Sequence, residues 1–447
     1  MDGNDIAAAF ILDTSWDALP ASVQRRARMC LLDDLASVLS GTLTRISQIT
    51  AGYAAERMPG DEATILLLGK RSTAPGAALA NAYAGNALDI DDDIRYAQGH
   101  PGAQVFPAAL AVAEKTGASG RALLEAMVVG YEIASRTARC WHDYHDVYQA
   151  CGSWGSVACA AVAGRLMNLR HDTLKHALGI AGYHAPNLPM MRDIDQPAMV
   201  KHGIGWGAMN GVISTELAER GFTGVPSILG FEQYRDWVAT LGSEYIMEEG
   251  VGFKRWCSCG WGHAGFAAAL KVVEEIDIRI EEIAHIKVRT FHEGWRLLQR
   301  HPQTTEEAQF SIKWPLATLL IDGEVGPNQI LEHRLDDEGV KALADKIEVV
   351  EDPEIERMNR LATTGAPDPD AHFAGRVEIT LADGRRLDSG VVTRGHHEWD
   401  EASLEEKFRW ITAYVLDDQT IDQLVQMVWG FENVANVTEL TRRVFVR

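Results

Sequence analysis

Apolar positions recur at helical spacing from Pro20 as far as Pro226. The segment that begins at Pro20 keeps its apolar side chains close to one face and stops at Gly41, which predicts a helix between these residues. The same spacing, with N-cap and glycine signals, predicts further helices over 73–88, 120–139, 151–169 and 203–220. The helix 151–169 is rich in Gly, Ala, Ser and Cys, so neighbouring helices can approach it closely, as is typical of a buried helix.

The pattern changes after Glu274. Apolar and polar residues alternate in a way that predicts strands over 284–291 and 346–350 and a hairpin over 375–394. Helical spacing lies between the strands over 305–320 and 335–344, and it returns from Ser403 onward. The second part of the chain is therefore predicted to contain an α+β unit.

The length of the chain favours two domains. Its 447 residues exceed what one hydrophobic core usually serves. We expect a mainly α protein with an α+β second domain. In this plan an all-helical large domain, formed by residues 1–268 and 398–447, is interrupted by a smaller α+β lid domain over residues 269–397.

The chain is acidic, with 63 Asp and Glu against 42 Lys and Arg and a net charge of -21. Because phosphate binding needs a basic face, this balance argues against a nucleic-acid partner. An anionic substrate would require a local cationic pocket.

The lack of a recognisable targeting signal and the use of cysteine predict a cytoplasmic location. The N-terminus lacks a basic region and its apolar run ends at Asp13, so no secretory signal is expected. No apolar run reaches the roughly eighteen residues of a membrane span. The six cysteines fit reduced thiols better than a disulfide framework in a chain of this length.

A polar segment lies between two Ala-rich helices at residues 86–110. It holds Asp89, Asp91, Asp92 and Asp93, which raise one another's pKa in a dry pocket unless cations or water compensate them. His100 directly precedes a proline that suits the first turn of the next helix, so this imidazole is expected at a helix mouth that also favours a bound anion. The segment predicts a site, and a solvated loop with helix caps is the plain alternative.

Two segments have the spacing of metal ligands. The spacing Asp89-x-x-Asp92-Asp93 matches a magnesium-diphosphate motif of all-α isoprenoid synthases, but a second acidic motif on a facing helix is not evident. Cys257-x-Cys259-x-x-x-His263 has the spacing of zinc ligands without an evident fourth ligand, so buried, inert cysteines are favoured. We therefore predict neither a metal nor another cofactor.

Two further segments supply cations. Lys201 and His202 precede a glycine-rich helix start, where bare backbone lets a ligand approach and presents N–H groups to an anion. Taken alone, such a lysine is more often a surface residue. Lys254 and Arg255 form a second cationic pair, close to His263.

The segment 89–108 resembles the D-x-D-D…H-P-x-x-x-x-x-P-A signature of the 2-methylcitrate dehydratase family (MmgE/PrpD), which includes cis-aconitate decarboxylase and iminodisuccinate epimerase. Similar matches recur in order along most of the chain, at 31–35, 130–136, 152–158, 199–207, 221–224, 253–263, 307–311 and 406–408. This resemblance implies the same two-domain plan, an active site in the cleft between the domains and a homodimer.

The resemblance also implies roles for individual residues. It places His100, Lys201, Asp89 and Lys254 in catalysis. Together with the chemistry of the side chains, it leads us to expect substrate contacts from Asp93, Gln149, His202, Arg255, Cys259, His263 and Trp314.

Four of these positions depart from the decarboxylase pattern. Gln149 stands where the decarboxylase and dehydratase branches have a histidine, and Cys259 stands where the decarboxylase branch has one. Asp93 and Trp314 replace its threonine and tyrosine. These departures argue against decarboxylation.

The expected function is that of a cofactor-independent lyase, a hydro-lyase resembling 2-methylcitrate dehydratase. It would act on a small di- or tricarboxylic acid by removing a proton next to a carboxylate. The alternative is an epimerase or racemase of a dicarboxylate that removes and returns a proton, as in the iminodisuccinate branch. A binding relative without catalysis is the third possibility.

Overall fold

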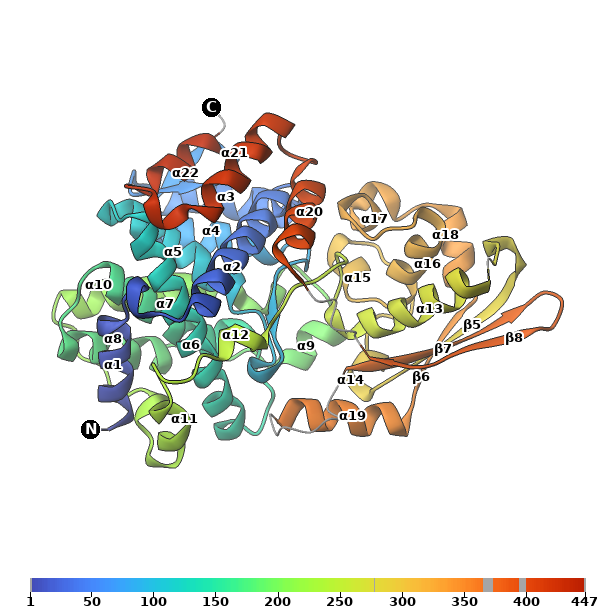
Figure 1. Ribbon diagram of the computed structural model, residues 1–447, viewed down its shortest axis with the longest axis horizontal. Helices are drawn as coiled ribbons and strands as arrows, with labels where there is room; N and C mark the ends of the chain where they lie inside the picture. Colours follow the sequence, from blue (N-terminus) through green and yellow to red (C-terminus); the bar gives the residue numbers. More distant parts are fainter. Residues whose placement is uncertain (1, 277, 365–372, 394–398, 446–447) are drawn as a thin grey trace.

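A computed structural model of the protein describes residues 2–276, 278–364, 373–393 and 399–445. Figure 1 shows a large helical part that carries both ends of the chain and a smaller part built around a sheet. The prediction of a mainly α protein with an α+β second part is thereby confirmed. In the described part of the chain, no helix has both the length and the apolar character needed to cross a membrane.

The helical part buries α7 (Cys151–Leu166) among the helices α5 (Gly102–Thr116), α6 (Gly120–Tyr144), α8 (His171–Tyr183) and α10 (Ile204–Glu219). Its small residues let α10 approach it closely: an added Cβ at Gly207 would lie 2.5 Å from the Gly152 carbonyl oxygen. The remaining helices of this part are α1 (Gly3–Asp13), α2 (Ala21–Gly41), α3 (Arg45–Arg57), α4 (Ala74–Asn86), α9 (Met190–Asp195), α11 (Arg235–Ala239) and α12 (Ile246–Gly250).

Local capping explains where several of these helices begin. Thr73 and Ser119 each accept a hydrogen bond from a first-turn N–H, of Gly76 and Ala122 respectively, so α4 and α6 start where the sequence predicts. Two short antiparallel pairs join these helices, β1 (Ala63–Ile65) with β2 (Lys70–Ser72), and β3 (Asp93–Ile94) with β4 (Val251–Gly252).

The smaller part holds a four-stranded sheet in the order β6-β5-β7-β8. The strand β5 (Ile283–Thr290) is parallel to β6 (Ile347–Glu351) and antiparallel to β7 (Ala374–Leu381), which forms a hairpin with β8 (Arg386–Thr393). All the predicted strands are therefore present, although Arg394 at the end of the predicted hairpin lies outside the described residues. The helices α13 (His263–Ile276) and α19 (Pro353–Thr364) pack on the sheet.

The predicted helix over 305–320 is wrong as a single helix. It is divided into α15 (Thr305–Gln309) and α16 (Lys313–Asp322). The chain breaks because Phe310 and Ser311 pair with Leu298 instead: the Leu298 N–H donates to the Phe310 carbonyl at 2.7 Å, and the Ser311 hydroxyl donates to the Leu298 carbonyl at 3.1 Å. The other short helices here are α14 (His292–Trp295), α17 (Pro327–Ile330) and α18 (Glu338–Ala344).

The last helices return to the helical part, as Figure 1 shows for α20 (Glu401–Thr412) beside α2. Buried Lys407 of α20 pairs with Asp33 of α2 and donates to the Ile90 carbonyl at 2.8 Å. The chain ends with α21 (Asp418–Trp429) and α22 (Thr438–Arg443). The domain boundaries themselves stay a prediction, and the one at 397–398 touches residues outside the described ranges.

Candidate active site

Backbone strain is concentrated at the predicted site. Six non-glycine residues in the described ranges have a positive φ, and three of them are Asp89, Lys201 and His202, with φ of 52°, 36° and 57°. The left-handed conformation costs such residues about 1–2 kcal/mol each. The surrounding structure must hold them there, and strain of this kind is typical of functional sites.

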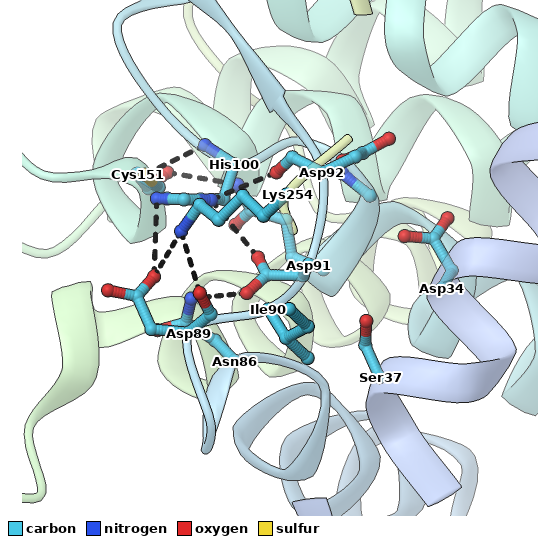
Figure 2. Close-up of polar contacts among 12 residues, drawn as sticks. Asp34, Ser37, Asn86, Asp89, Ile90, Asp91, Asp92, His100, Cys151 and Lys254 are labelled. Carbon is cyan, nitrogen blue, oxygen red and sulfur yellow. Dashed lines mark hydrogen bonds and ion pairs between the residues drawn. The ribbon is translucent and has the colours of Figure 1, made fainter. Parts of the chain in front are cut away.

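Lys254 and Asp89 form a buried ion pair. In Figure 2 the Lys254 ammonium and the His100 ring both point toward the Asp89 carboxylate. Lys254 Nζ lies 2.5 Å from Asp89 Oδ1 and 3.0 Å from the Asp89 carbonyl oxygen. Burial alone would raise the pKa of Asp89, but Lys254, Lys201 and His100 hold it well below its usual range. Burial would likewise lower the pKa of Lys254, yet the nearby carboxylates of Asp89, Asp91 and Asp93 raise it. Both groups therefore stay charged.

His100 is oriented through its Nδ1 atom. This atom lies 2.9 Å from the Asp92 carbonyl oxygen and 3.1 Å from Asp91 Oδ2. Because both neighbours accept, Nδ1 carries the proton, and the Nε2 lone pair of the neutral ring is left for chemistry. Nε2 lies 3.8 Å from Asp89 Oδ1, beyond hydrogen-bonding distance. Burial and Lys254 lower the pKa of His100, but Asp91 and Asp89 outweigh them and raise it.

A second imidazole lies against the first. The rings of His100 and His202 stack with centroids 5.7 Å apart. Asp193 holds His202 at two points, accepting from its main-chain N–H at 2.8 Å and lying 2.9 Å from its Nδ1. The edge of Phe310 covers its other side. These contacts explain how the strained turn at Lys201–His202 is held.

Lys201 is fully buried without a carboxylate partner. Its Nζ donates to Gln309 Oε1 at 2.6 Å and lies 4.8 Å from the centre of the Phe310 ring. Among the residues that the structure describes, no carboxylate oxygen lies within 4.0 Å of this ammonium, whereas buried Lys254 and Lys407 each have one. Lys201 therefore acts on Asp89 and Asp193 through its charge without a direct ion pair.

Two buried aspartates, Asp34 and Asp92, flank the hydroxyl of Tyr131. The Tyr131 hydroxyl lies 2.5 Å from Asp92 Oδ2 and 2.9 Å from Asp34 Oδ2. One hydroxyl proton cannot serve two carboxylates, so one of the two acids must carry a proton of its own. Burial, with Asp33 and Asp91 nearby, raises the pKa of Asp92 to about 8. One proton therefore remains on the pair of Asp34 and Asp92 at neutral pH.

Four other predicted residues are engaged by the protein itself, and of these Asp93 and Cys259 lie near Lys254. Asp93 pairs with Gly252 in a short strand and acts on Lys254 through its charge. The Cys259 N–H donates to the Gln309 carbonyl at 3.0 Å, and burial raises the pKa of its thiol to about 12. His263 Nε2 lies 3.3 Å from the Ser258 hydroxyl. Gln149 Oε1 accepts from the Leu188 N–H at 2.7 Å.

The structure does not bring Arg255 and Trp314 to the cluster. Arg255 is exposed although Lys254 before it is buried, and its guanidinium lies over the Trp256 ring. Trp314 is buried, and its indole N–H donates to the Gln329 carbonyl at 2.9 Å. Their assignment as substrate contacts is not supported by this geometry.

Two residues that sequence reasoning did not single out belong to the cluster. Gln309 lies inside the 307–311 match, which was a signal for the segment but not for the residue. Asp193 has no sequence signal, since it is recognised only through its contacts with His202.

The cluster also has the geometry of a metal site. In the described part of the chain, Asp89, Asp91 and His100 form the one group of three potential ligands, with atoms within 4.8 Å of one another, and Cys257, Cys259 and His263 form none. A divalent cation here would have to displace the ammonium of Lys254, which already lies against Asp89. The donor set is therefore better matched to its own lysine.

Comparisons with known proteins identify the family of this chain. Models of the MmgE/PrpD N-terminal and C-terminal domains match residues 5–245 and 256–430. The chain is 25% identical to a cis-aconitate decarboxylase-like protein of Aspergillus oryzae, over 94% of this chain and 93% of that protein. It is 26% identical to a cis-aconitate decarboxylase of Homo sapiens, over 94% and 89% of the two chains. The two domain models together span most of the sequence, and the chain therefore belongs to the MmgE/PrpD family.

Proposed function

We propose that this protein is a lyase that removes a proton from the carbon next to a carboxylate of a small di- or tricarboxylic acid. The observation that carries the proposal is Lys201, a buried ammonium that forms no ion pair with any carboxylate in the described ranges. It lies over the Phe310 ring, which packs on His202, and His202 stacks on His100. Relatives that are named cis-aconitate decarboxylases, and so act on a small tricarboxylate, support the substrate class.

The mechanism follows from the charges around His100. Lys201 binds one carboxylate of the substrate, and Lys254, which is shared with Asp89, attracts a second. Neutralising these charges makes the adjacent C–H more acidic, and His100 Nε2 removes the proton. The Nδ1 contacts with Asp91 and the Asp92 carbonyl hold the ring and stabilise the imidazolium that forms. His202 is the second imidazole available to protonate a leaving hydroxyl.

Dehydration is proposed over decarboxylation because of Cys259, which stands where the decarboxylase branch has a histidine; Gln149 replaces a histidine of both branches and does not separate them. The Gln149 oxygen already accepts from the Leu188 N–H, and an amide does not donate a proton in catalysis. The buried Cys259 thiol, with a pKa of about 12, is a poor proton donor near neutral pH. Neither position supplies the acid that a histidine there would supply.

The glutamine at position 149 favours epimerisation as the second candidate. A site without an acid at Gln149 suits a reaction that only removes and returns a proton. The two candidates differ in whether a group leaves the substrate.

The test is incubation of the purified protein in D2O with hydroxy-di- and tricarboxylic acids, followed by NMR and ultraviolet absorbance. A hydro-lyase exchanges the proton next to the carboxylate and gives an alkene that absorbs in the ultraviolet. An epimerase exchanges the proton without forming an alkene. Release of carbon dioxide would favour decarboxylation, and no exchange with any acid of the panel would refute the proposal.

A further inference from the structure

Gln309 lies at the end of α15 in the smaller part, yet its side chain bonds to two groups of the helical part. Its Oε1 accepts from Lys201 Nζ at 2.6 Å, and its Nε2 donates to the Ala87 carbonyl oxygen at 2.8 Å. The side chain is fully buried. Because an ammonium only donates and a carbonyl only accepts, the orientation of the amide is fixed.

The amide gives Lys201 an acceptor without a charge. Buried Lys254 and Lys407 have aspartates as partners, and buried Arg136 has Glu132 at 2.5 Å. A lysine ammonium has three N–H donors, of which Gln309 takes one. The direction of the ammonium is therefore set while its charge stays available.

We propose that Gln309 is the positioning residue that gives this site its preference for an anionic ligand group. It aims the Lys201 ammonium and ties it to the end of α4, and its neutrality leaves the positive charge for a carboxylate of the ligand. A glutamate in its place would supply the same acceptor oxygen together with a charge, and Lys201 would no longer need the ligand. This inference rests on the proposed function, because it takes Lys201 as the carboxylate-binding group.

The first experiment measures binding of propane-1,2,3-tricarboxylate, a tricarboxylate without a hydroxyl group to eliminate, by calorimetry. Gln309→Glu should weaken its affinity at least about tenfold, since a protein carboxylate already compensates Lys201. Gln329→Glu is the matched control: Gln329 is a buried glutamine of the same part whose Oε1 accepts from the Gly326 N–H at 3.0 Å and whose Nε2 donates to Asp322 at 3.0 Å. The Gln329→Glu variant should bind the tricarboxylate as tightly as the wild type.

Thermal unfolding without ligand gives a second reading with opposite signs. Gln309→Glu should raise the melting temperature, because the ion pair it forms with Lys201 outweighs the lost donor to the Ala87 carbonyl, whereas Gln329→Glu should lower it by placing a carboxylate beside Asp322. In a Lys201→Met background, Gln309→Glu should instead lower the melting temperature, because the new carboxylate would be buried without a cation. A role in packing alone would not reverse this sign.

The outcomes separate the two proposals. If Lys201→Met binds the tricarboxylate as tightly as the wild type, the proposed function loses its carboxylate-binding group. If Lys201→Met loses binding but Gln309→Glu keeps it, only the inference on Gln309 is overturned. If the wild type does not bind this probe, the stability measurements decide alone: the same effect of Gln309→Glu in both backgrounds overturns the inference.

Discussion

Asp34→Asn should stabilise the protein, and the gain should grow with pH. Asp34 and Asp92 flank the Tyr131 hydroxyl, and the folded protein keeps a proton on this pair that the unfolded chain releases. The pKa of Asp92 rises from its ordinary value of 3.8 to about 8. Because the folded pKa is the higher one, the stabilising contribution is complete below the unfolded pKa and is lost as the pH rises through the folded value.

The size of the effect follows from this difference. About four pKa units, at about 1.4 kcal/mol each, give an upper limit on the order of 5 kcal/mol at pH 8. Local relaxation reduces the cost, and neutral replacements of buried charged groups typically gain about 1–4 kcal/mol. We expect a gain in this range at pH 8 and almost none near pH 4. The asparagine amide can donate to the Tyr131 oxygen, which frees the hydroxyl proton for Asp92.

Urea unfolding of the wild type and Asp34→Asn, at several values between about pH 5.5 and about pH 8.5, measures the gap in unfolding free energy. The groups facing the pair, which include Cys30 and Asp33 on α2, Asp91 and His100, are the same in both proteins. Asp143→Asn is the matched control, since exposed Asp143 accepts from a single tyrosine, Tyr234, at 2.9 Å without a second acid.

A gap that stays flat across this range, or a variant less stable than the wild type at pH 8, would refute the shared proton. Infrared spectroscopy gives an independent reading. The carbonyl band of a protonated carboxylic acid should persist at neutral pH in the wild type and disappear in Asp34→Asn.

Three further predictions concern the site itself. Lys201→Met should lower kcat/KM by roughly two orders of magnitude or more and raise the melting temperature, since it removes a buried charge. A kcat/KM near that of the wild type with the true substrate would contradict the role of Lys201. Lys201→Arg should restore little activity, because a planar guanidinium does not replace a compact ammonium. Proton exchange should fail in His100→Asn, and in the wild type it should decline as the pH drops through the raised pKa of His100, because only the neutral ring accepts a proton; a rate unchanged in that variant would exclude His100 as the base. A saturating ligand should protect residues 254–263 and 310–314 from hydrogen exchange if the smaller part closes as a lid, and unchanged exchange in both segments would contradict closure.

The sequence predicted the elements that depend on local signals. Caps at Thr73 and Ser119 and the alternation in 284–291 are readable from neighbouring residues, and the predicted helices and strands are found there. The break after Gln309 was missed because its cause, pairing with Leu298, is not local. That break is also what brings Gln309 and Phe310 to Lys201.

The site was predictable as a set of segments but not as a set of contacts. Asp89, Lys201 and Lys254 come from three segments that the family pattern marks, and the fold brings their charges together. Arg255 shows the limit of such reasoning, since it is adjacent to Lys254 in sequence yet points to the exposed side. The positive φ values at the site have no sequence signature in residues other than glycine.

In the proposed function, the charge of Lys201 that binds the substrate also prepares His100 as the base. In this buried site each carboxylate that enters beside Lys201 acts on His100 as Asp91 and Asp89 already do, favouring the imidazolium and raising its pKa. The neutral ring of the complex is therefore a stronger proton acceptor than that of the free protein. The pair of Asp34 and Asp92 has the opposite effect on the pKa of His100. Because this pair keeps a proton, it adds less negative charge to the cluster than two ionised aspartates would. Binding and proton removal are thus coupled through one set of charges, and the ligand supplies the anion that Lys201 lacks.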